Sequence, residues 1–224
     1  MAELLLELFS EEIPARLQAR AADDLKRLAG DMLAKEGFEG FALRSFATPR
    51  RLVLVAEGLA EKQKDTREER RGPRLGSPEQ AMAGFLKSVG LQNAEQCESR
   101  DGYYYATLHK KGRRTSEILA ALVPALITAL PWAKSMRWGT GALRWVRPLQ
   151  SVLCLFGGRV VPFNVGELRS GDTTRGHRFL SPAPFAVRDF ADYAKKLSRA
   201  QVMLDGEERR AFIQRGAQAL AISR

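Results

Sequence analysis

The chain has 224 residues, of which 45% are hydrophobic and 28% charged, and its formal net charge is +10 with a sequence pI near 10.0. This composition is typical of a globular protein with a buried core, and the sequence lacks the run of about 18 apolar residues that a membrane-spanning helix needs. Since the apolar start has no basic leader and the only thiols are Cys97 and Cys154, we expect a cytoplasmic protein without disulfides or a zinc site.

The first sixty residues predict a strand, a helix and two further strands. Residues 2–9 form a short apolar run of strand length, and apolar residues recur at intervals of three to four from Pro14 to about Gly37, which predicts an amphipathic helix. Residues 38–47 and 51–59 favour strands, and Thr48-Pro49-Arg50 offers a tight connection between them. This order predicts an amino-terminal α+β unit over residues 1–60.

Residues 61–77 are predicted to be a charged loop or linker, because nine of the eleven residues from Glu61 to Arg71 are charged and a stretch rich in Gly and Pro follows. Residues 78–187 are predicted to be an α+β body. Its expected elements are a helix over 78–89, a strand over 103–109, a helix over 116–130 interrupted by Pro124, and a hairpin of strands 149–156 and 159–165 that turns at Gly157-Gly158.

The last part of the chain, residues 188–224, is predicted to be helical. Two helices are expected, over 188–200 and 205–221, the second with Asp205 as its N-cap. The whole pattern therefore predicts an α+β fold with mixed or antiparallel sheets, packed helices and two sub-domains.

The sequence shows no constellation that could perform chemistry on its own. There is no G-x-x-x-x-G-K-[ST] loop and no G-x-G-x-x-G after a strand, and His109 and His177 lie far apart without a nearby acidic or cysteine cluster. Glu11 and Glu12 are adjacent, so on a helix their carboxylates would point in different directions. We therefore assign no catalytic residue and no metal ligand to this chain.

A basic segment stands out in the middle of the chain. Between Gly102 and Gly166 the only acidic residue is Glu117, against nine Lys and Arg residues, and three tryptophans (Trp132, Trp138 and Trp145) interleave with the cations. Cations next to indoles can neutralise phosphates and stack on bases, so the candidate nucleic-acid contacts here are Lys134, Arg137, Trp138, Arg144 and Arg147. The alternative interpretation buries the indoles in the core and leaves the arginines solvated or paired within the protein.

The segment Thr173-Thr174-Arg175-Gly176-His177-Arg178-Phe179 adds Arg175 and Arg178 to these candidates, because a glycine and two arginines can surround an anion. For His177 we predict a structural or anion-contacting role rather than that of a catalytic base. Phe179 is expected to anchor the loop against the sheet.

Six short strings, taken in order, resemble the β subunit of the heterotetrameric bacterial glycyl-tRNA synthetase, although Ser10 and Ile13 replace the Thr and Leu of its commoner form. The strings are Glu11-Glu12-Ile13-Pro14, Phe46-Ala47-Thr48-Pro49-Arg50-Arg51-Leu52, Gly72-Pro73 before Gly84-Phe85, Met136-Arg137-Trp138-Gly139 with Val146-Arg147-Pro148, Thr174-Arg175-Gly176-His177-Arg178-Phe179, and Asp205-Gly206-Glu207-Glu208-Arg209-Arg210. Subunits of that family are much longer, so the chain is expected to be an amino-terminal portion that lacks the HD-like and anticodon-binding domains.

The resemblance implies a division of labour between two subunits. In this family the α subunit resembles class II synthetases and holds the glycine, ATP and Mg²⁺ sites, so no cofactor is expected on this chain. The β subunit supports recognition of glycine tRNA within an α₂β₂ complex, with no membrane contact. The alternative is a pure assembly module that docks the α subunit, or the rest of β, without direct contact to RNA.

Overall fold

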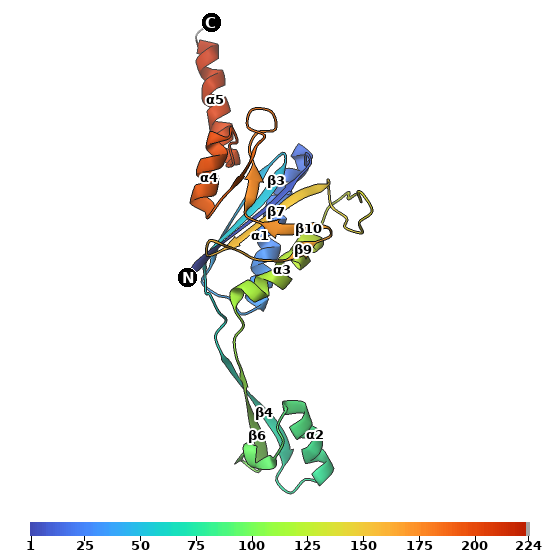
Figure 1. Ribbon diagram of the computed structural model, residues 1–224. Helices are drawn as coiled ribbons and strands as arrows, with labels where there is room; N and C mark the ends of the chain where they lie inside the picture. The colour runs from blue at the N-terminus through green and yellow to red at the C-terminus, as the bar shows by residue number, and fades with distance from the viewer. Residues whose placement is uncertain (223–224) are drawn as a thin grey trace. The chain divides into compact units, whose positions relative to one another are not determined.

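The computed structural model describes residues 1–222 and divides the chain into two compact units (Figure 1). The larger unit comprises residues 1–61 together with the chain from residue 114 onward, and the smaller one comprises residues 62–113. Both units combine helices with strands, which confirms the predicted α+β class. Within the described residues, no helix is long and apolar enough to cross a membrane.

A mixed sheet forms the centre of the larger unit. Its strands follow the order β2-β3-β1-β7-β10-β9, with β8 paired to β7, and only β10 runs parallel to its neighbour β7. The strands are β1 (Ala2–Ser10), β2 (Ala42–Thr48), β3 (Arg51–Leu59), β7 (Leu149–Phe156), β8 (Arg159–Val160), β9 (Asn164–Val165) and β10 (Leu168–Gly171). Residues 4–10 of β1 are all buried, because this strand has sheet neighbours on both sides and is covered on both faces.

Helices cover the two faces of this sheet. On one face, Leu4, Leu6 and Leu8 belong to the core that includes α1 (Ala15–Lys35) and α3 (Thr115–Ala129). On the other face, Leu5 belongs to a smaller core with α4 (Phe190–Arg199). Alternate residues of one strand thus serve two cores, as the period of two in a strand requires. The two-stranded ribbon of β11 (Thr173–Arg175) and β12 (Pro184–Ala186) and the carboxy-terminal helix α5 (Gly206–Ile222) complete this unit.

A buried carboxylate ties the second face together. Glu7 is 0% exposed, and its Oε2 accepts hydrogen bonds from Arg51 Nε at 3.1 Å and from the Tyr193 hydroxyl. The other oxygen, Oε1, accepts from Thr174 Oγ1 at 2.6 Å, while Arg51 also donates to the carbonyl of Arg175 at 2.7 Å. Burial and the neighbouring Glu7 raise the pKa of Tyr193, which keeps its hydroxyl a donor. These bonds fasten β11 and α4 to the sheet.

The smaller unit is a three-stranded antiparallel sheet with one helix. Its strands follow the order β4-β6-β5, and its elements are β4 (Thr66–Arg74), α2 (Glu79–Val89), a 3₁₀ turn (Ala94–Gln96), β5 (Glu98–Arg100) and β6 (Tyr103–Lys110). The loop predicted over residues 61–77 is therefore wrong for most of its length, because β4 pairs with β6 along that stretch. Its residues 66–71 are all exposed at the edge of the sheet, so this strand carries no apolar alternation that the sequence could reveal.

The division of the chain also differs from the one expected. Residues 78–113 lie in the smaller unit and residues 114–187 in the larger one, so the predicted body over 78–187 is split. The helical residues 188–222 belong to the larger unit rather than to a separate segment. The small unit is thus an insertion between β3 and α3. The large unit is formed by the two parts of the chain that precede and follow this insertion.

Most of the other predicted elements are confirmed within a few residues, with three differences of detail. The strand expected from Phe38 begins at Ala42, and the strand expected over 159–165 is broken into β8 and β9. Helix α3 is not interrupted at Pro124 but continues through it. One turn later, Thr128 Oγ1 donates a hydrogen bond to the Pro124 carbonyl at 2.9 Å. Asp205 caps α5 as predicted, since its Oδ1 accepts from the backbone N–H groups of residues 207 and 208 at 2.8 and 3.3 Å.

Candidate nucleic-acid interface

The basic segment after α3 forms a closed loop whose indoles are largely core residues. The backbones of Met136 and Trp145 exchange two hydrogen bonds, at 2.8 and 3.1 Å. Trp145 is 0% exposed and lies edge-on against Trp132 with ring centroids 4.9 Å apart, while Trp138 is half-buried and packs on the same core. Base stacking on Trp145 is therefore ruled out in this fold, and the candidate Trp138 has only part of its surface free.

The four cations of this segment are all exposed but differ in their partners. Lys134 and Arg137 make no hydrogen bond or ion pair with any residue from 1 to 222. Arg144 donates to Oγ and to the carbonyl of Ser135, at 3.3 and 3.4 Å. Arg147 donates through Nε to the carbonyl of Glu12 at 3.1 Å. None of the four is neutralised by a carboxylate within the described chain.

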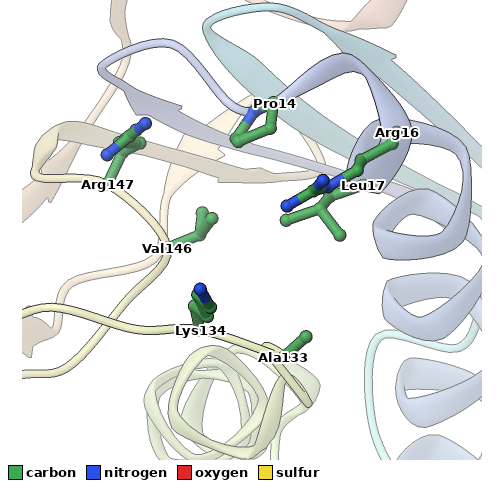
Figure 2. A pocket seen from close by; sticks show the side chains of 7 residues that line it. All are labelled: Pro14, Arg16, Leu17, Ala133, Lys134, Val146 and Arg147. Atoms are coloured by element: carbon green, nitrogen blue, oxygen red, sulfur yellow. The ribbon is translucent and has the colours of Figure 1, made fainter.

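Two of these cations meet at a shallow pocket of about 420 Å³ (Figure 2). The side chains that line it are Pro14, Arg16, Leu17, Ala133, Lys134, Val146 and Arg147. Lys134 comes from the loop after α3, Arg147 from the segment before β7, and Arg16 from the first turn of α1. No acidic side chain lines the pocket, so three cations surround an apolar floor.

Sequence reasoning missed Arg16 as a site residue. It occupies the first turn of a 21-residue helix that has no acidic residue in that turn and no side-chain cap at Pro14. A cation there is unfavourable, because the amino end of a helix already carries partial positive charge. The absence of acidic residues from this turn could have indicated an anion-binding site in the sequence, because an external anion would interact favourably with both the helix end and Arg16.

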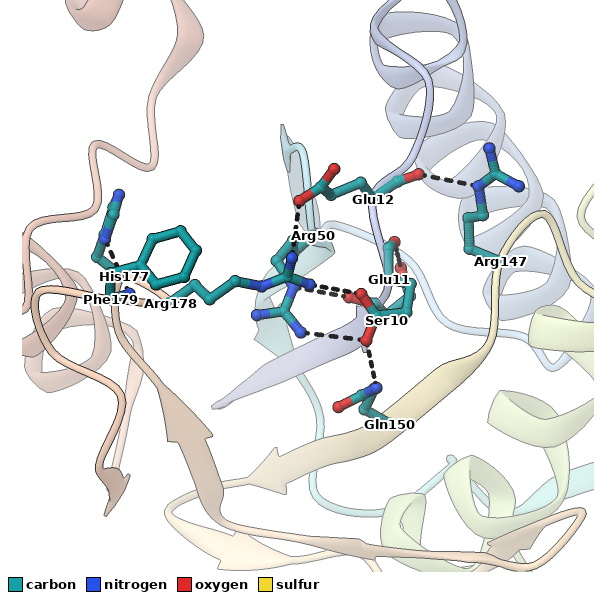
Figure 3. Close-up of polar contacts among 9 residues, drawn as sticks. All are labelled: Ser10, Glu11, Glu12, Arg50, Arg147, Gln150, His177, Arg178 and Phe179. Carbon is teal, nitrogen blue, oxygen red and sulfur yellow. Dashed lines mark hydrogen bonds and ion pairs between the residues drawn. The ribbon is translucent and has the colours of Figure 1, made fainter.

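Arg175 and Arg178 do not line the pocket of Figure 2 and are engaged by the protein itself, and Figure 3 shows the contacts of Arg178. Arg178 contacts Glu11 Oε2 at 2.6 Å and Glu12 Oε1 at 3.2 Å. Arg175 donates to the carbonyl of Pro182 at 3.2 Å. The structure therefore does not bring the seven predicted contacts together: Lys134 and Arg147 share the pocket of Figure 2, whereas Arg178 forms ion pairs with two carboxylates.

The carboxylate of Glu11 is the centre of this second group. Besides Arg178, it accepts from Gln150 Nε2 at 2.6 Å and lies 3.6 Å from Arg50 NH2. Burial, followed by the nearby charge of Arg178, lowers the pKa of Arg50, and its guanidinium lies 4.7 Å from the centre of the Phe9 ring. An anion entering here would approach Glu11 as well as the arginines, so the group is arranged for internal pairing.

Comparison with known proteins decides which family these segments come from. The family model described as the glycyl-tRNA synthetase beta subunit matches residues 4–224, almost the entire chain. The chain belongs to this family. It corresponds to the amino-terminal portion of the subunit. Three strings that carry the resemblance in sequence meet in the fold, because residues 11–12, 50–51 and 174–178 supply the pairs around Glu11 and Glu7.

Curated relatives of this β-subunit family agree in name. The glycine–tRNA ligase β subunit of Phenylobacterium zucineum is 54% identical over 100% of the chain and 34% of its own length. Those of Ruegeria sp. and Paracoccus denitrificans are 52% and 51% identical, over 95% and 100% of the chain and 32% and 34% of their own lengths. The chain therefore spans about a third of the β subunits that it matches.

His177 organises the loop that carries this part of the β-subunit sequence. Its Nδ1 accepts from the backbone N–H groups of Phe179 and Leu180, both at 3.2 Å, and its own backbone N–H donates to the Ala200 carbonyl at 2.9 Å. A Cβ on Gly176 would lie 2.5 Å from Cβ of Ala200, so only glycine fits this approach. The predicted anchor is wrong: Phe179 is 79% exposed, and the loop is held by Gly176 and His177 instead.

The remaining candidate chemistry is sparse. Among residues 1–222, no group of three His, Cys, Asp or Glu side chains is placed to hold a metal ion. Cys154 is buried, which raises the pKa of its thiol well above the usual range, and burial also raises the pKa of the half-buried Cys97. Neither thiol is placed as a reactive nucleophile.

Proposed function

We propose that this chain supports the charging of glycine tRNA as part of a glycyl-tRNA synthetase β subunit, by contacting phosphates of the tRNA through Arg16, Lys134 and Arg147. The observation that carries the proposal is the pocket of Figure 2, where three cations from different elements converge and no acidic side chain intervenes. Phosphate contacts supply much of the affinity of proteins for RNA. The net charge of +10 supports the same conclusion.

The pocket suits a phosphate better than a base. Its floor consists of aliphatic side chains, and the fully buried Trp145 offers no free ring. The uncapped amino end of α1 directs partial positive charge to the same place. Arg137 and Arg144 are exposed on the neighbouring loop and would extend the contact along the backbone, whereas Arg175 and Arg178 are assigned to the internal contacts that hold the loop.

The same proposal leaves the chemical step to another subunit. Glycine, ATP and Mg²⁺ are expected in the α subunit of a cytoplasmic α₂β₂ complex, and this chain provides neither a phosphate-binding loop nor metal ligands among its described residues. A preparation of the chain free of α subunit is therefore expected to show no glycine-dependent exchange of pyrophosphate into ATP. Robust exchange would overturn this part of the proposal.

A second candidate function is that of an assembly module, and one observation favours it. Helix α5 has no buried residue, and Phe212, Ile213, Leu220 and Ile222 are between 58% and 86% exposed. Exposed apolar side chains on one helix are typical of a surface that contacts another protein segment. This role would use α5 and would leave the pocket of Figure 2 without an RNA ligand.

Binding of unmodified glycine tRNA to the chain over a salt series separates the two functions. The triple variant Arg16→Gln, Lys134→Gln, Arg147→Gln is expected to weaken binding and to flatten the plot of log K against log salt by about 0.7 to 0.9 for each phosphate that the protein no longer neutralises. The matched control is Lys26→Gln, Lys35→Gln, Lys195→Gln, which removes the same charge from exposed lysines that likewise have no carboxylate partner among the described residues. If both triple variants behave alike, the pocket is not the contact.

A further inference from the structure

The small unit has one face of its sheet covered and the other open. Helix α2 packs against one side, where the ring of Phe85 lies 2.5 Å from the position of a Cβ on Gly72 and Ala106 of β6 is fully buried. Successive residues of a strand point to opposite faces, so Tyr103, Tyr105 and Thr107 share the side away from Ala106. Thr107 is exposed and the two tyrosines are half-buried, as expected for a face that no other element covers.

On this open face, arginines from both neighbouring strands lie over the tyrosine rings. The guanidinium of Arg71 in β4 lies 4.8 Å from the ring centre of Tyr103, and that of Arg100 in β5 lies 4.6 Å from the ring centre of Tyr105. Register explains the arrangement, because Arg71 is directly opposite Tyr105 and Arg100 is directly opposite Tyr103. We call these four residues the tyrosine face.

The charges around the tyrosine face favour an anionic ligand. Residues 62–113 contain eleven Lys and Arg against seven Asp and Glu. One of those acids, Glu69, accepts from Arg100 NH2 at 2.9 Å, and this hydrogen bond raises the pKa of Arg100. At the other end of the same two strands, the exposed Arg67 is directly opposite His109, which shares the side of Tyr103 and Tyr105, and Lys64 and Lys111 are exposed just beyond the strands. The face thus offers aromatic rings and cations along the direction of β4 and β6.

We infer that the tyrosine face binds unpaired nucleotides of RNA, with bases stacking on Tyr103 and Tyr105 and phosphates contacting Arg71. Aromatic rings set in a basic surface bind single strands without sequence preference, because every base has a π-face. A duplex keeps its bases stacked inside and cannot use the rings. The inference rests on the proposed contact with RNA, but it assigns a second site that does not share a residue with the pocket of Figure 2.

The chemistry of the face argues for RNA rather than a protein partner. Among the large apolar side chains of residues 62–113, only Leu75 is highly exposed, at 46%. A surface that docks another protein is usually rich in exposed apolar or aromatic area at its centre, whereas here each ring is already paired with a cation. The guanidinium groups of Arg71 and Arg100 beside the two tyrosine rings present polar edges and flat faces, which match a strand of nucleotides.

The test is binding of the whole 224-residue chain to a short fluorescein-labelled single-stranded RNA and to a blunt RNA duplex of the same composition, followed by anisotropy. The variant Tyr103→Leu, Tyr105→Leu keeps apolar volume but removes the rings, and it should lose about 5- to 150-fold in affinity for the single strand per stacked base. Its affinity for the duplex should not change. Tyr103→Phe, Tyr105→Phe keeps both rings and should bind the single strand like the parent chain.

Two further variants keep the inference open to refutation. Lys87→Gln removes a charge from α2, on the covered side of the same unit, and should have no effect. If the leucine variant unfolds the small unit, Arg71→Gln should still flatten the salt dependence of single-strand binding, because Arg71 is exposed and has no carboxylate partner among the described residues, whereas Arg100 is already paired with Glu69. Unchanged single-strand affinity in the leucine and the glutamine variants would overturn the inference and reassign the face to contact with a protein.

Failure of this inference differs from failure of the proposed function. The variants of Arg16, Lys134 and Arg147 should weaken tRNA binding while the preference for single-stranded over duplex RNA persists. The tyrosine variants should abolish that preference and leave the salt dependence contributed by the pocket intact. An equal loss for single strand and duplex in the leucine variant would show that the rings are structural and would also overturn the inference.

Discussion

Two groups of basic side chains in the larger unit are similar in residue type but differ in their partners within the protein. In the loop of β11, Arg178 contacts two carboxylates, and Arg175 donates to a backbone carbonyl. Around the pocket of Figure 2, Arg16 and Lys134 have no carboxylate partner among the described residues, and Arg147 contacts only a carbonyl. The comparison teaches that the number of basic residues in a segment does not give its free charge. Whether a basic side chain is free depends on its hydrogen-bond and ion-pair partners, and these come from distant parts of the chain.

The largest expected effect comes from breaking the buried pair beneath the loop group. Arg51→Met removes the cation from Glu7, which is 0% exposed, and leaves a buried carboxylate without its ion-pair partner. The free energy of unfolding should fall by about 3 to 5 kcal/mol. Chemical denaturation measures this loss, and Arg27→Met, which breaks only exposed ion pairs on α1, should cost less than about 1 kcal/mol. Equal losses would contradict the structural role of the pair.

A smaller loss is expected where the loop meets α4. Gly176→Ala would place a Cβ 2.5 Å from Cβ of Ala200 and 2.8 Å from two carbonyl oxygens, so the backbone must shift. Overpacking of this kind costs about 1 to 3 kcal/mol in the free energy of unfolding. Gly171→Ala is the matched control, because a Cβ there meets no atom within 4 Å. A thermal or urea unfolding series that fails to separate the two variants would refute the close packing.

The direct contrast between the two groups is a pair of single substitutions. Lys134→Gln should lower the affinity for glycine tRNA and reduce the salt slope by about 0.7 to 0.9, because an unpaired cation is removed. Arg178→Gln should leave the slope unchanged, since its charge is already paired with Glu11 and Glu12. Filter binding at several salt concentrations measures both slopes. A larger change in Arg178→Gln would reverse the assignment of the two groups.

His177→Gln is expected to have the smallest effect. Two backbone N–H groups lose the imidazole acceptor, but both lie in an exposed loop where water can replace it, and glutamine retains an acceptor oxygen. The free energy of unfolding should fall by less than about 1.5 kcal/mol, and the charging activity of the assembled enzyme should be largely preserved. A loss of turnover by orders of magnitude with unchanged folding and tRNA affinity would identify His177 as a catalytic group.

The sequence predicted those elements in which side-chain pattern and environment agree. The apolar run at Leu4, Leu6 and Leu8 and the periodicity of α1 indicated a strand and a helix, and both were found, with these residues packed into one core. The strand β4 was missed because its side chains are charged and exposed, so its only strong signal is pairing with β6, which lies about thirty residues later. Non-local pairing leaves no local pattern.

The sequence predicted two of the basic residues of the candidate site but not how its side chains are arranged in space. Lys134 and Arg147 were identified from the basic segment, but their convergence with Arg16 depends on how α1, α3 and β7 pack. The sequence could not show that Trp145 is fully buried or that Arg178 reaches Glu11, which lies far away in the chain. Residue types indicated the chemistry, and tertiary contacts determined which of them are free to use it.

The positions of the three tryptophans make intrinsic tryptophan fluorescence a local probe of this protein. All three tryptophans fall between residues 132 and 145, in and next to the loop that borders the pocket of Figure 2, and the small unit has none. Trp145 and Trp132 are in ring contact inside the core, while Trp138 reaches the surface of the same loop. Changes in indole emission will therefore report events at this loop and in the core beside it without any label, and the small unit contributes no indole signal of its own.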